Sequence, residues 1–188
     1  MNYFRICPEQ PYKHQIKIMI LGERCSGKTC LLEKLAGRTA PVDYTPTMKI
    51  EPVDIYYKSL SYIVKLQVLD FHPDMLKFTT VGGIHRGTRI YIITADISRA
   101  DCVELLEDEI DRLNLYIDKS ARRIIVGTKI DLALDGIEAE VIRYCEWYKL
   151  DYLVDMHTLK ETVCSSFVHN KIQTNYSSQL SEYIENLI

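Results

Sequence analysis

The sequence predicts an α/β fold, a mostly parallel six-stranded sheet with helices on both faces. Short, almost continuously apolar runs alternate with longer segments whose apolar residues recur every three or four positions. These are the patterns of buried strands and of amphipathic helices. Strands that are apolar on both sides are typical of a parallel sheet with helices on each face. The 188 residues, 47% of them hydrophobic and 26% charged, suit a globular protein with a full core.

The expected strands follow in order along the chain. They lie at residues 16–21, 53–58, 62–69, 90–95, 123–127 and 152–154. Only three residues separate the second run from the third, and both are rich in β-forming side chains. We therefore expect these two strands to form an antiparallel hairpin at one edge of the sheet.

The expected helices alternate with the strands. They lie at residues 29–35, within the loop before the fourth strand, at 100–117, at about 135–148, and in the tail from Gln179. The longest of these has apolar residues at helical spacing, at Val103, Leu106, Ile110, Leu113 and Tyr116. No repeat or linker interrupts the order. We expect a short polar extension at residues 1–14 and one domain at residues 15–188.

The most informative motif lies at residues 22–29, G-E-R-C-S-G-K-T, which has the spacing G-x-x-x-x-G-K-[ST] of a phosphate-binding loop. Gly22 and Gly27 allow backbone angles that a side chain would forbid. The motif lies between a predicted strand and a predicted helix, so backbone N–H groups and the helix N-terminus can face an anion. Lys28 would reach the β- and γ-phosphates, and the Thr29 hydroxyl would bind Mg²⁺.

A second motif indicates which base accompanies the phosphates. Residues 126–131 read V-G-T-K-I-D at the end of a predicted strand. A carboxylate can accept hydrogen bonds from guanine N1–H and from its 2-amino group, which adenine does not present. Asp131 would take this role, and the stem of Lys129 would lie along the plane of the base.

The motifs together resemble a small GTPase of the Ras superfamily, and most closely the Rab branch, over about residues 15–160. Thr47 follows the loop lysine at the spacing of the switch I threonine, and Asp70 ends a strand like the one that leads into the family's D-x-x-G motif. Arg86 and Gly87 match the R-G pair before the next strand in Rab proteins. The resemblance implies the P-loop GTPase fold.

The resemblance also implies the ligands, GTP or GDP with Mg²⁺. The metal would be held by Thr29, Thr47 and Asp70. The nucleotide would contact Gly22, Cys25, Ser26, Gly27, Lys28, Thr29, Cys30, Thr47, Thr128, Lys129, Asp131, Thr158, Leu159 and Lys160. The last three, T-L-K, stand where the family has S-A-K. Protein effectors, and an exchange factor, would bind the two switch regions at residues 42–50 and 71–87.

Switch II departs from the family pattern. Phe71-His72-Pro73-Asp74 stands where the family reads T-A-G-Q. Pro73 has no N–H to donate to the γ-phosphate. The family glutamine orients the attacking water, whereas an ionised Asp74 only accepts hydrogen bonds and repels phosphate. We therefore expect slow or impaired hydrolysis, with Asp74 a weak candidate for a catalytic residue.

Arg24 is a second candidate within the phosphate loop, where the family usually has Gly or Ser. It could stabilise the transition state as an arginine finger from the same chain. It could equally point to solvent and obstruct a partner's arginine.

Two further departures predict fast nucleotide exchange. Ala40 replaces an aromatic residue that covers the base, and Thr128 replaces an asparagine that links the base loop to the phosphate loop.

Three functional hypotheses follow. The chain is a slow GTPase switch, or a GTP-binding scaffold that does not cycle, or another P-loop enzyme such as a small-molecule kinase. The third would not need Asp131 and lacks an arginine-rich lid. Comparing GTP retention with multiple-turnover hydrolysis distinguishes the first two.

Composition limits the partners and the compartment. A net charge of −3 provides no general attraction for nucleic acid. Six cysteines without a C-x-x-C pair are typical of a reducing, cytoplasmic compartment. No apolar run could span a membrane, and the C-terminus lacks a cysteine to prenylate. We expect a cytoplasmic monomer with no membrane anchor of its own, recruited to membranes, if at all, through a partner.

Overall fold

The computed structural model describes residues 14–39, 52–58, 63–70, 81–117 and 121–153. These residues form a six-stranded sheet in the order β2-β3-β1-β4-β5-β6. The strands are β1 (His14–Leu21), β2 (Pro52–Lys58), β3 (Ile63–Asp70), β4 (Thr88–Asp96), β5 (Arg122–Thr128) and β6 (Asp151–Leu153). All six predicted strands are present, with ends shifted by only one or two residues.

The sheet is parallel except at one edge. β2 pairs with β3 in an antiparallel register, as the short connection predicted. Every other pairing is parallel, with β1 between β3 and β4, and β5 between β4 and β6. The sequence-based expectation of a mostly parallel six-stranded sheet is confirmed.

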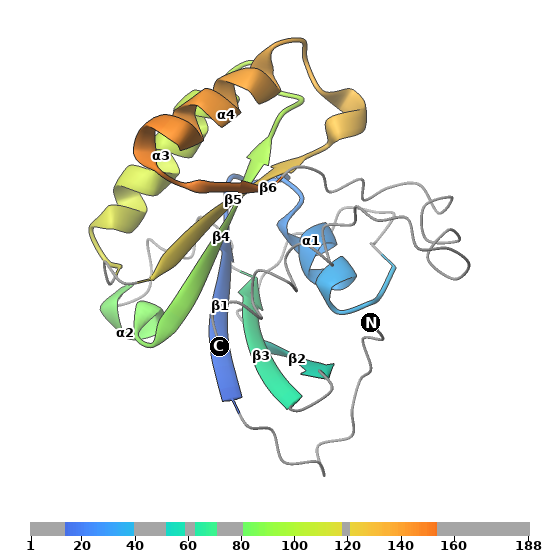
Figure 1. The fold of residues 1–188 in the computed structure, drawn as a ribbon, viewed down its shortest axis with the longest axis vertical. Coiled ribbons are helices and arrows are strands. Elements are labelled where there is room, and N and C mark those ends of the chain that lie inside the picture. The colour runs from blue at the N-terminus through green and yellow to red at the C-terminus, as the bar shows by residue number, and fades with distance from the viewer. Residues whose placement is uncertain (1–13, 40–51, 59–62, 71–80, 118–120, 154–188) are drawn as a thin grey trace.

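Helices cover both faces of this sheet (Figure 1). They are α1 (Lys28–Leu35), α2 (Val81–His85), α3 (Cys102–Asn114) and α4 (Ile137–Tyr148), with a 3-10 turn, η2, at Ile130–Leu132. α3 and α4 pack against each other on one face, and α1 lies on the other. The predicted tail helix from Gln179 lies outside the described residues.

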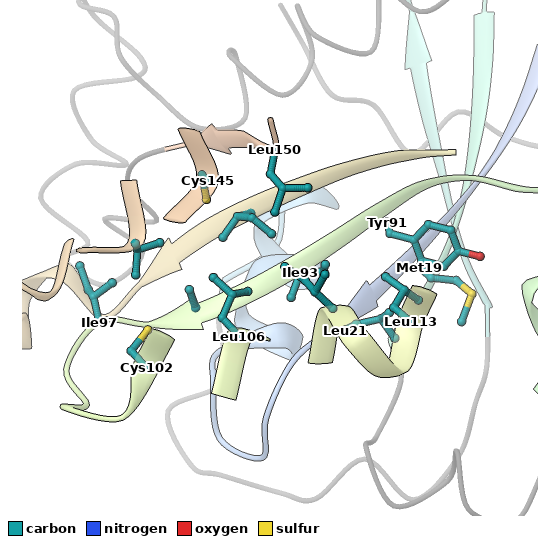
Figure 2. Close-up of a cluster of buried hydrophobic side chains, with 14 of the residues drawn as sticks. Met19, Leu21, Tyr91, Ile93, Ile97, Cys102, Leu106, Leu113, Cys145 and Leu150 are labelled. Atoms are coloured by element: carbon teal, nitrogen blue, oxygen red, sulfur yellow. The ribbon is translucent and has the colours of Figure 1, made fainter. Parts of the chain in front are cut away.

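The two faces have separate cores because strand side chains alternate. Along β1, Ile16, Ile18 and Ile20 join the cluster that includes the leucines of α1. Met19 and Leu21 join the cluster on the opposite face. That second cluster gathers side chains of β1, β4 and β5 with those of α3 and α4, as Figure 2 shows. Strands buried on both sides account for the continuously apolar runs.

Parallel pairing determines where a site can form. The carboxyl ends of β1, β3, β4 and β5 lie at one edge of the sheet, so the loops that follow them come together there. Open α/β sheets bind ligands in the crevice at this edge. Among the described residues, none of the helices has the length and apolar content to cross a lipid bilayer.

Candidate functional site: a phosphate loop beside a base loop

The loop between β1 and α1 has a backbone that few residues can adopt. Gly22, Cys25 and Gly27 all have positive φ, at 134°, 61° and 90°. A Cβ on Gly22 would lie 2.2 Å from Thr94 Oγ1, so both the angle and the space require glycine. Left-handed residues within a turn create concavities of backbone N–H groups that bind anions. The two glycines were predicted; the left-handed Cys25 was not.

Lys28 is the cation of this loop. Its side chain is buried, and Nζ donates hydrogen bonds to the carbonyl oxygens of Gly22 at 2.9 Å and Glu23 at 2.6 Å. Burial lowers the pKa of Lys28, an effect opposed by the negative charges of Asp70, Glu109 and Glu23. A buried ammonium held mainly by carbonyl oxygens of its own loop is suited to receive an anionic ligand, and phosphate fits this donor set.

Thr29 and Asp70 form the part of the site suited to a metal. Thr29 is the second residue of α1 and Asp70 is the last residue of β3, and the Thr29 hydroxyl donates to Asp70 Oδ2 at 2.6 Å. A hydroxyl and a carboxylate are oxygen ligands, which Mg²⁺ prefers. These two residues would suit a magnesium ion held beside the phosphate loop. They are the two predicted metal ligands that fall within the described part of the chain.

A group of buried hydroxyls fixes the phosphate loop to the strands behind it. Ser26 Oγ and Thr94 Oγ1 lie 2.6 Å apart, and Thr94 also donates to the carbonyl of Leu21 at 3.1 Å. Thr94 is buried in the middle of an apolar strand, β4. Sequence reasoning did not select it. A lone polar residue within a run of isoleucines was the available signal.

Thr128 corrects one of the sequence-based expectations. Its replacement of asparagine was expected to remove a link between the base loop and the phosphate loop. Instead, Thr128 Oγ1 donates to the carbonyl of Ser26 at 2.8 Å and lies 3.2 Å from the carbonyl of Ala95. The threonine side chain is short, but it lies buried at the end of β5, close enough to the phosphate loop for its hydroxyl to reach the Ser26 carbonyl. The two loops are therefore linked, and this ground for fast exchange is wrong.

The base loop follows β5. Lys129 adopts a left-handed conformation with φ 56°, and its ammonium forms an ion pair with Asp96 at 2.6 Å. Asp96 ends β4, is buried, and also accepts hydrogen bonds from the backbone N–H and hydroxyl of Ser98. Asp131 lies in η2 with its side chain exposed. The loop thus presents the Asp131 carboxylate to solvent, while the Asp96 carboxylate at the end of β4 holds Lys129.

The remaining predicted residues divide into two groups. Arg24 and Cys25 are exposed on the phosphate loop, and Cys30 is half-buried on α1, where burial raises the pKa of its thiol. The second group lies outside the described residues: Thr47, Asp74, Thr158, Leu159 and Lys160. The structure brings together the phosphate loop, Asp70 and the base loop at one edge of the sheet.

The comparison with known families agrees with this arrangement. A model of the Ras family matches residues 17–176, so the chain belongs to the Ras family of small GTPases. Its relatives bear Ypt and Rab names, so within the superfamily the chain is similar to the Rab branch.

Three relatives illustrate the similarity. The GTP-binding protein YPTM1 of Zea mays is 28% identical over 126 residues, which cover 65% of this chain and 59% of the relative. The GTP-binding protein ypt1 of Schizosaccharomyces pombe is 24% identical over 133 residues (71% and 64%). The Ras-related protein RabY of Dictyostelium discoideum is 27% identical over 154 residues (77% and 64%). The chain thus spans about three-fifths of the length of the curated relatives it matches.

Proposed function

We propose that this protein binds GTP and GDP with Mg²⁺ and acts as a Rab-like molecular switch whose intrinsic GTP hydrolysis is slow. The observation that carries the proposal is the joining of two loops. Lys28 and the Thr29–Asp70 pair would form a phosphate and metal site, and the Thr128 hydroxyl connects the loop of Lys28 directly to a base loop with an exposed Asp131. A bound nucleotide would occupy both loops at once, with its phosphates at the phosphate loop and its base at the base loop.

The guanine preference rests on Asp131 and its neighbours. An exposed carboxylate accepts two hydrogen bonds from guanine, while Lys129 would contact the base. Thr158, Leu159 and Lys160 stand where the family has S-A-K, and their backbone would contact the guanine oxygen. We propose these contacts together with the nucleotide contacts of the other residues of the two loops.

The slow hydrolysis rests on switch II. Pro73 cannot donate a hydrogen bond to the γ-phosphate, and Asp74 would repel it. Arg24 is exposed on the loop beside the phosphate site. It acts either as an arginine finger or as an obstacle to a partner's arginine, and we favour the obstacle. Ala40 leaves the base without an aromatic cover, which favours fast nucleotide release.

A non-hydrolysing GTP-binding scaffold is the second candidate function, favoured by the same Pro73 and Asp74. In both cases, effectors and an exchange factor would bind around residues 42–50 and 71–87. We expect a cytoplasmic monomer that a partner could recruit to membranes.

The test begins with the nucleotide that copurifies with the full chain, released by denaturation and identified by chromatography. The proposal expects GDP or GTP in about equimolar amount, and it expects no guanine nucleotide in Lys28→Met. An adenine nucleotide, or none that can be loaded, would refute it. Single- and multiple-turnover hydrolysis then separates the switch from the scaffold. If Arg24→Ala leaves the single-turnover rate unchanged, Arg24 is not a finger.

A further inference from the structure

Large apolar side chains are exposed where α3 and α4 end. Six such side chains are exposed among the described residues, and four of them lie there: Leu115, Tyr116, Trp147 and Tyr148. Trp147 is the only tryptophan of the chain and is 83% exposed. A single exposed apolar residue is ordinary, whereas a group that includes tryptophan and tyrosine is typical of a protein interface.

The topology brings these two helix ends together. α3 connects β4 to β5, and α4 connects β5 to β6, so both helices run back against three parallel strands. The helices pack against each other and lie side by side in Figure 1. Their last residues therefore lie where the strands begin. The phosphate loop and the base loop lie at the opposite end of the strands.

Three aromatic side chains near the end of α4 form what we call the aromatic surface: Tyr144, Trp147 and Tyr148. The rings of Tyr144 and Tyr148 lie 4.6 Å apart. Tyr144 is half-buried and packs against the core that α4 shares with α3. Trp147 follows Tyr144 by three residues, so the two are neighbours on the helix. Tyr144 thus orders the surface before any partner arrives, which lowers the entropy lost on binding.

The two helices are strongly acidic. Together they carry eight acidic and two basic side chains, a net charge of −6, whereas the whole chain carries −3. The rest of the chain is therefore positive overall. Both arginines pair with carboxylates of their own helices, Arg112 with Glu109 and Arg143 with Glu140. Negative charge is thus concentrated on the face that carries the aromatic surface.

Carboxylates border the aromatic surface from both helices. Glu140 is exposed and precedes Tyr144 by four residues and Trp147 by seven, so it lies on the same face of α4. On the adjacent α3, Glu107 is exposed. Burial, followed by the charge of Glu107, raises the pKa of Tyr144 to about 12, which agrees with this placement. The rings and the carboxylates therefore form one continuous surface.

An occupant of this surface must complement both the rings and the carboxylates. The two helices would repel an anionic membrane or a nucleic acid. A second copy of the chain would bring the same acidic helices against them. Residues 154–188 carry four acidic and two basic side chains, so this segment is also negative overall. The complementary occupant is a chain that presents lysine or arginine beside apolar side chains.

We propose that the aromatic surface and its acidic border are a docking site for a basic amphipathic helix of a partner protein. Such a helix combines both chemistries in one element, an apolar stripe with charged residues beside it. Its apolar side chains would cover Trp147 and Tyr148, and its cations would meet the carboxylates of α3 and α4. Because the nucleotide site lies at the other end of the strands, docking is independent of the bound nucleotide.

The test uses the full chain and a pair of labelled helical peptides. One peptide, of about 14 residues or four turns, has leucines along one face and lysines elsewhere. In its counterpart, glutamate replaces every lysine. Binding is followed by the anisotropy of the peptide label. Trp147 provides an independent signal, since the emission of the only tryptophan shifts to shorter wavelength when its ring leaves water.

Five variants separate the anchor from the charge. Trp147→Ala removes the ring, Trp147→Phe keeps an aromatic side chain, and the double variant Glu107→Lys with Glu140→Lys reverses the border charge. The matched controls, Leu134→Ala and Asp135→Lys, make the same kinds of change at exposed positions before α4. All five residues are exposed, so the melting temperature of each variant should match that of the wild type.

The wild type should bind the lysine peptide with a Kd of about 100 μM or lower, and the glutamate peptide at least about tenfold more weakly. Trp147→Ala should weaken binding of the lysine peptide by about tenfold or more, and Trp147→Phe by less. The charge reversal should weaken it by about tenfold and flatten its salt dependence. Both controls should match the wild type, as should protein loaded with GDP or with a GTP analogue.

Equal binding of the lysine peptide to the wild type and to Trp147→Ala would overturn the proposal, as would preference for the glutamate peptide. So would a different occupant. A dimer that Trp147→Ala converts to monomer would assign the surface to a second copy. Binding of phosphatidylcholine vesicles through Trp147 would assign it to lipid. Emission typical of a buried tryptophan in the free chain would assign it to another segment of the same chain.

The peptide measurements need no nucleotide, so this inference and the proposed function can fail separately. If the chain binds the lysine peptide through Trp147 but binds no guanine nucleotide, the proposed function fails and the docking site stands. If the chain binds GDP but neither peptide, the docking proposal fails and the proposed function stands.

Discussion

Thr29 and Asp70 lie 41 positions apart in the sequence, yet the Thr29 hydroxyl donates a hydrogen bond to Asp70 Oδ2 at 2.6 Å. The pair places two oxygen ligands at the ends of α1 and β3. If this pair holds Mg²⁺, removing the hydroxyl should weaken the metal site and leave the phosphate loop otherwise intact.

Thr29→Ala should therefore lower the affinity for Mg²⁺ by about tenfold to hundredfold. The measurement is the release rate of a fluorescent GDP analogue as Mg²⁺ is titrated. Wild-type release should accelerate when the metal is chelated, whereas the variant should release quickly even in millimolar Mg²⁺. Thr29→Ser keeps the hydroxyl and is the control. Equal Mg²⁺ dependence in Thr29→Ala and the wild type would contradict the assignment.

Asp131→Asn should change the base preference from guanine to xanthine. The amide can accept a hydrogen bond from N1–H and donate one to the 2-oxo group of xanthine, but it leaves the 2-amino group of guanine facing a donor. We expect GDP affinity to fall by about a hundredfold or more, with a gain for xanthosine diphosphate. Asp135→Asn, an exposed carboxylate four residues on, is the control. A variant that still prefers GDP would show that Asp131 does not contact the base.

Gly22→Ala should destabilise the fold even without nucleotide. The added Cβ would lie 2.2 Å from Thr94 Oγ1 and 2.8 Å from the Thr94 carbonyl oxygen, at a φ of 134°. Backbone strain and overpacking together predict a loss of about 2–5 kcal/mol in the free energy of unfolding. Gly136→Ala, at φ 85° with nothing within 4 Å of the added atom, isolates the strain and should cost about 1–2 kcal/mol. Denaturant unfolding would measure both, and equal losses would rule out the contact with Thr94.

His85 predicts a dependence of stability on pH. Its ring stacks on Tyr91 and Tyr116, Nδ1 lies 3.1 Å from the Tyr91 hydroxyl, and Nε2 has no hydrogen-bond partner among the described residues. Burial, and then the charge of Lys17, lower the pKa of His85. As the pH falls through about 6.5, the unfolded chain takes up a proton that the folded chain resists, so the free energy of unfolding falls.

The slope attributable to His85 should reach at most about 1.4 kcal/mol per pH unit below pH 6.5. His85→Phe keeps an aromatic ring in the stack and should remove that part of the slope. Urea unfolding between pH 7.5 and pH 5.5 would measure it in both proteins. An unchanged slope in His85→Phe would assign the acid sensitivity to other groups.

The sequence predicted most of the fold because its signals are local. Apolar runs and helical spacing depend on neighbouring residues, and all six strands followed from them. The phosphate loop and Asp70 were also predictable, because the chemistry of phosphate and Mg²⁺ constrains residue type and spacing. Their meeting at one edge of the sheet follows from parallel pairing.

Long-range contacts were not predictable in the same way. The role of Thr94 depends on a hydroxyl 68 positions away, and the burial of Glu109 depends on how α3 packs against the phosphate loop. Neither contact leaves a local pattern. Thr128 was misjudged because the expectation rested on its replacing an asparagine, whereas a side chain's reach also depends on how closely the two backbones approach.

The hydrogen bond from Thr128 to the Ser26 carbonyl has a consequence for how the protein is made. The phosphate loop is synthesised early, but groups that hold its shape follow 68 and 102 positions later. On the ribosome, the loop can acquire its final form only after β4 and β5 have emerged and joined the sheet. A nucleotide in the cell therefore cannot guide the first steps of folding, and it meets a finished site only once β4 and β5 have joined the sheet.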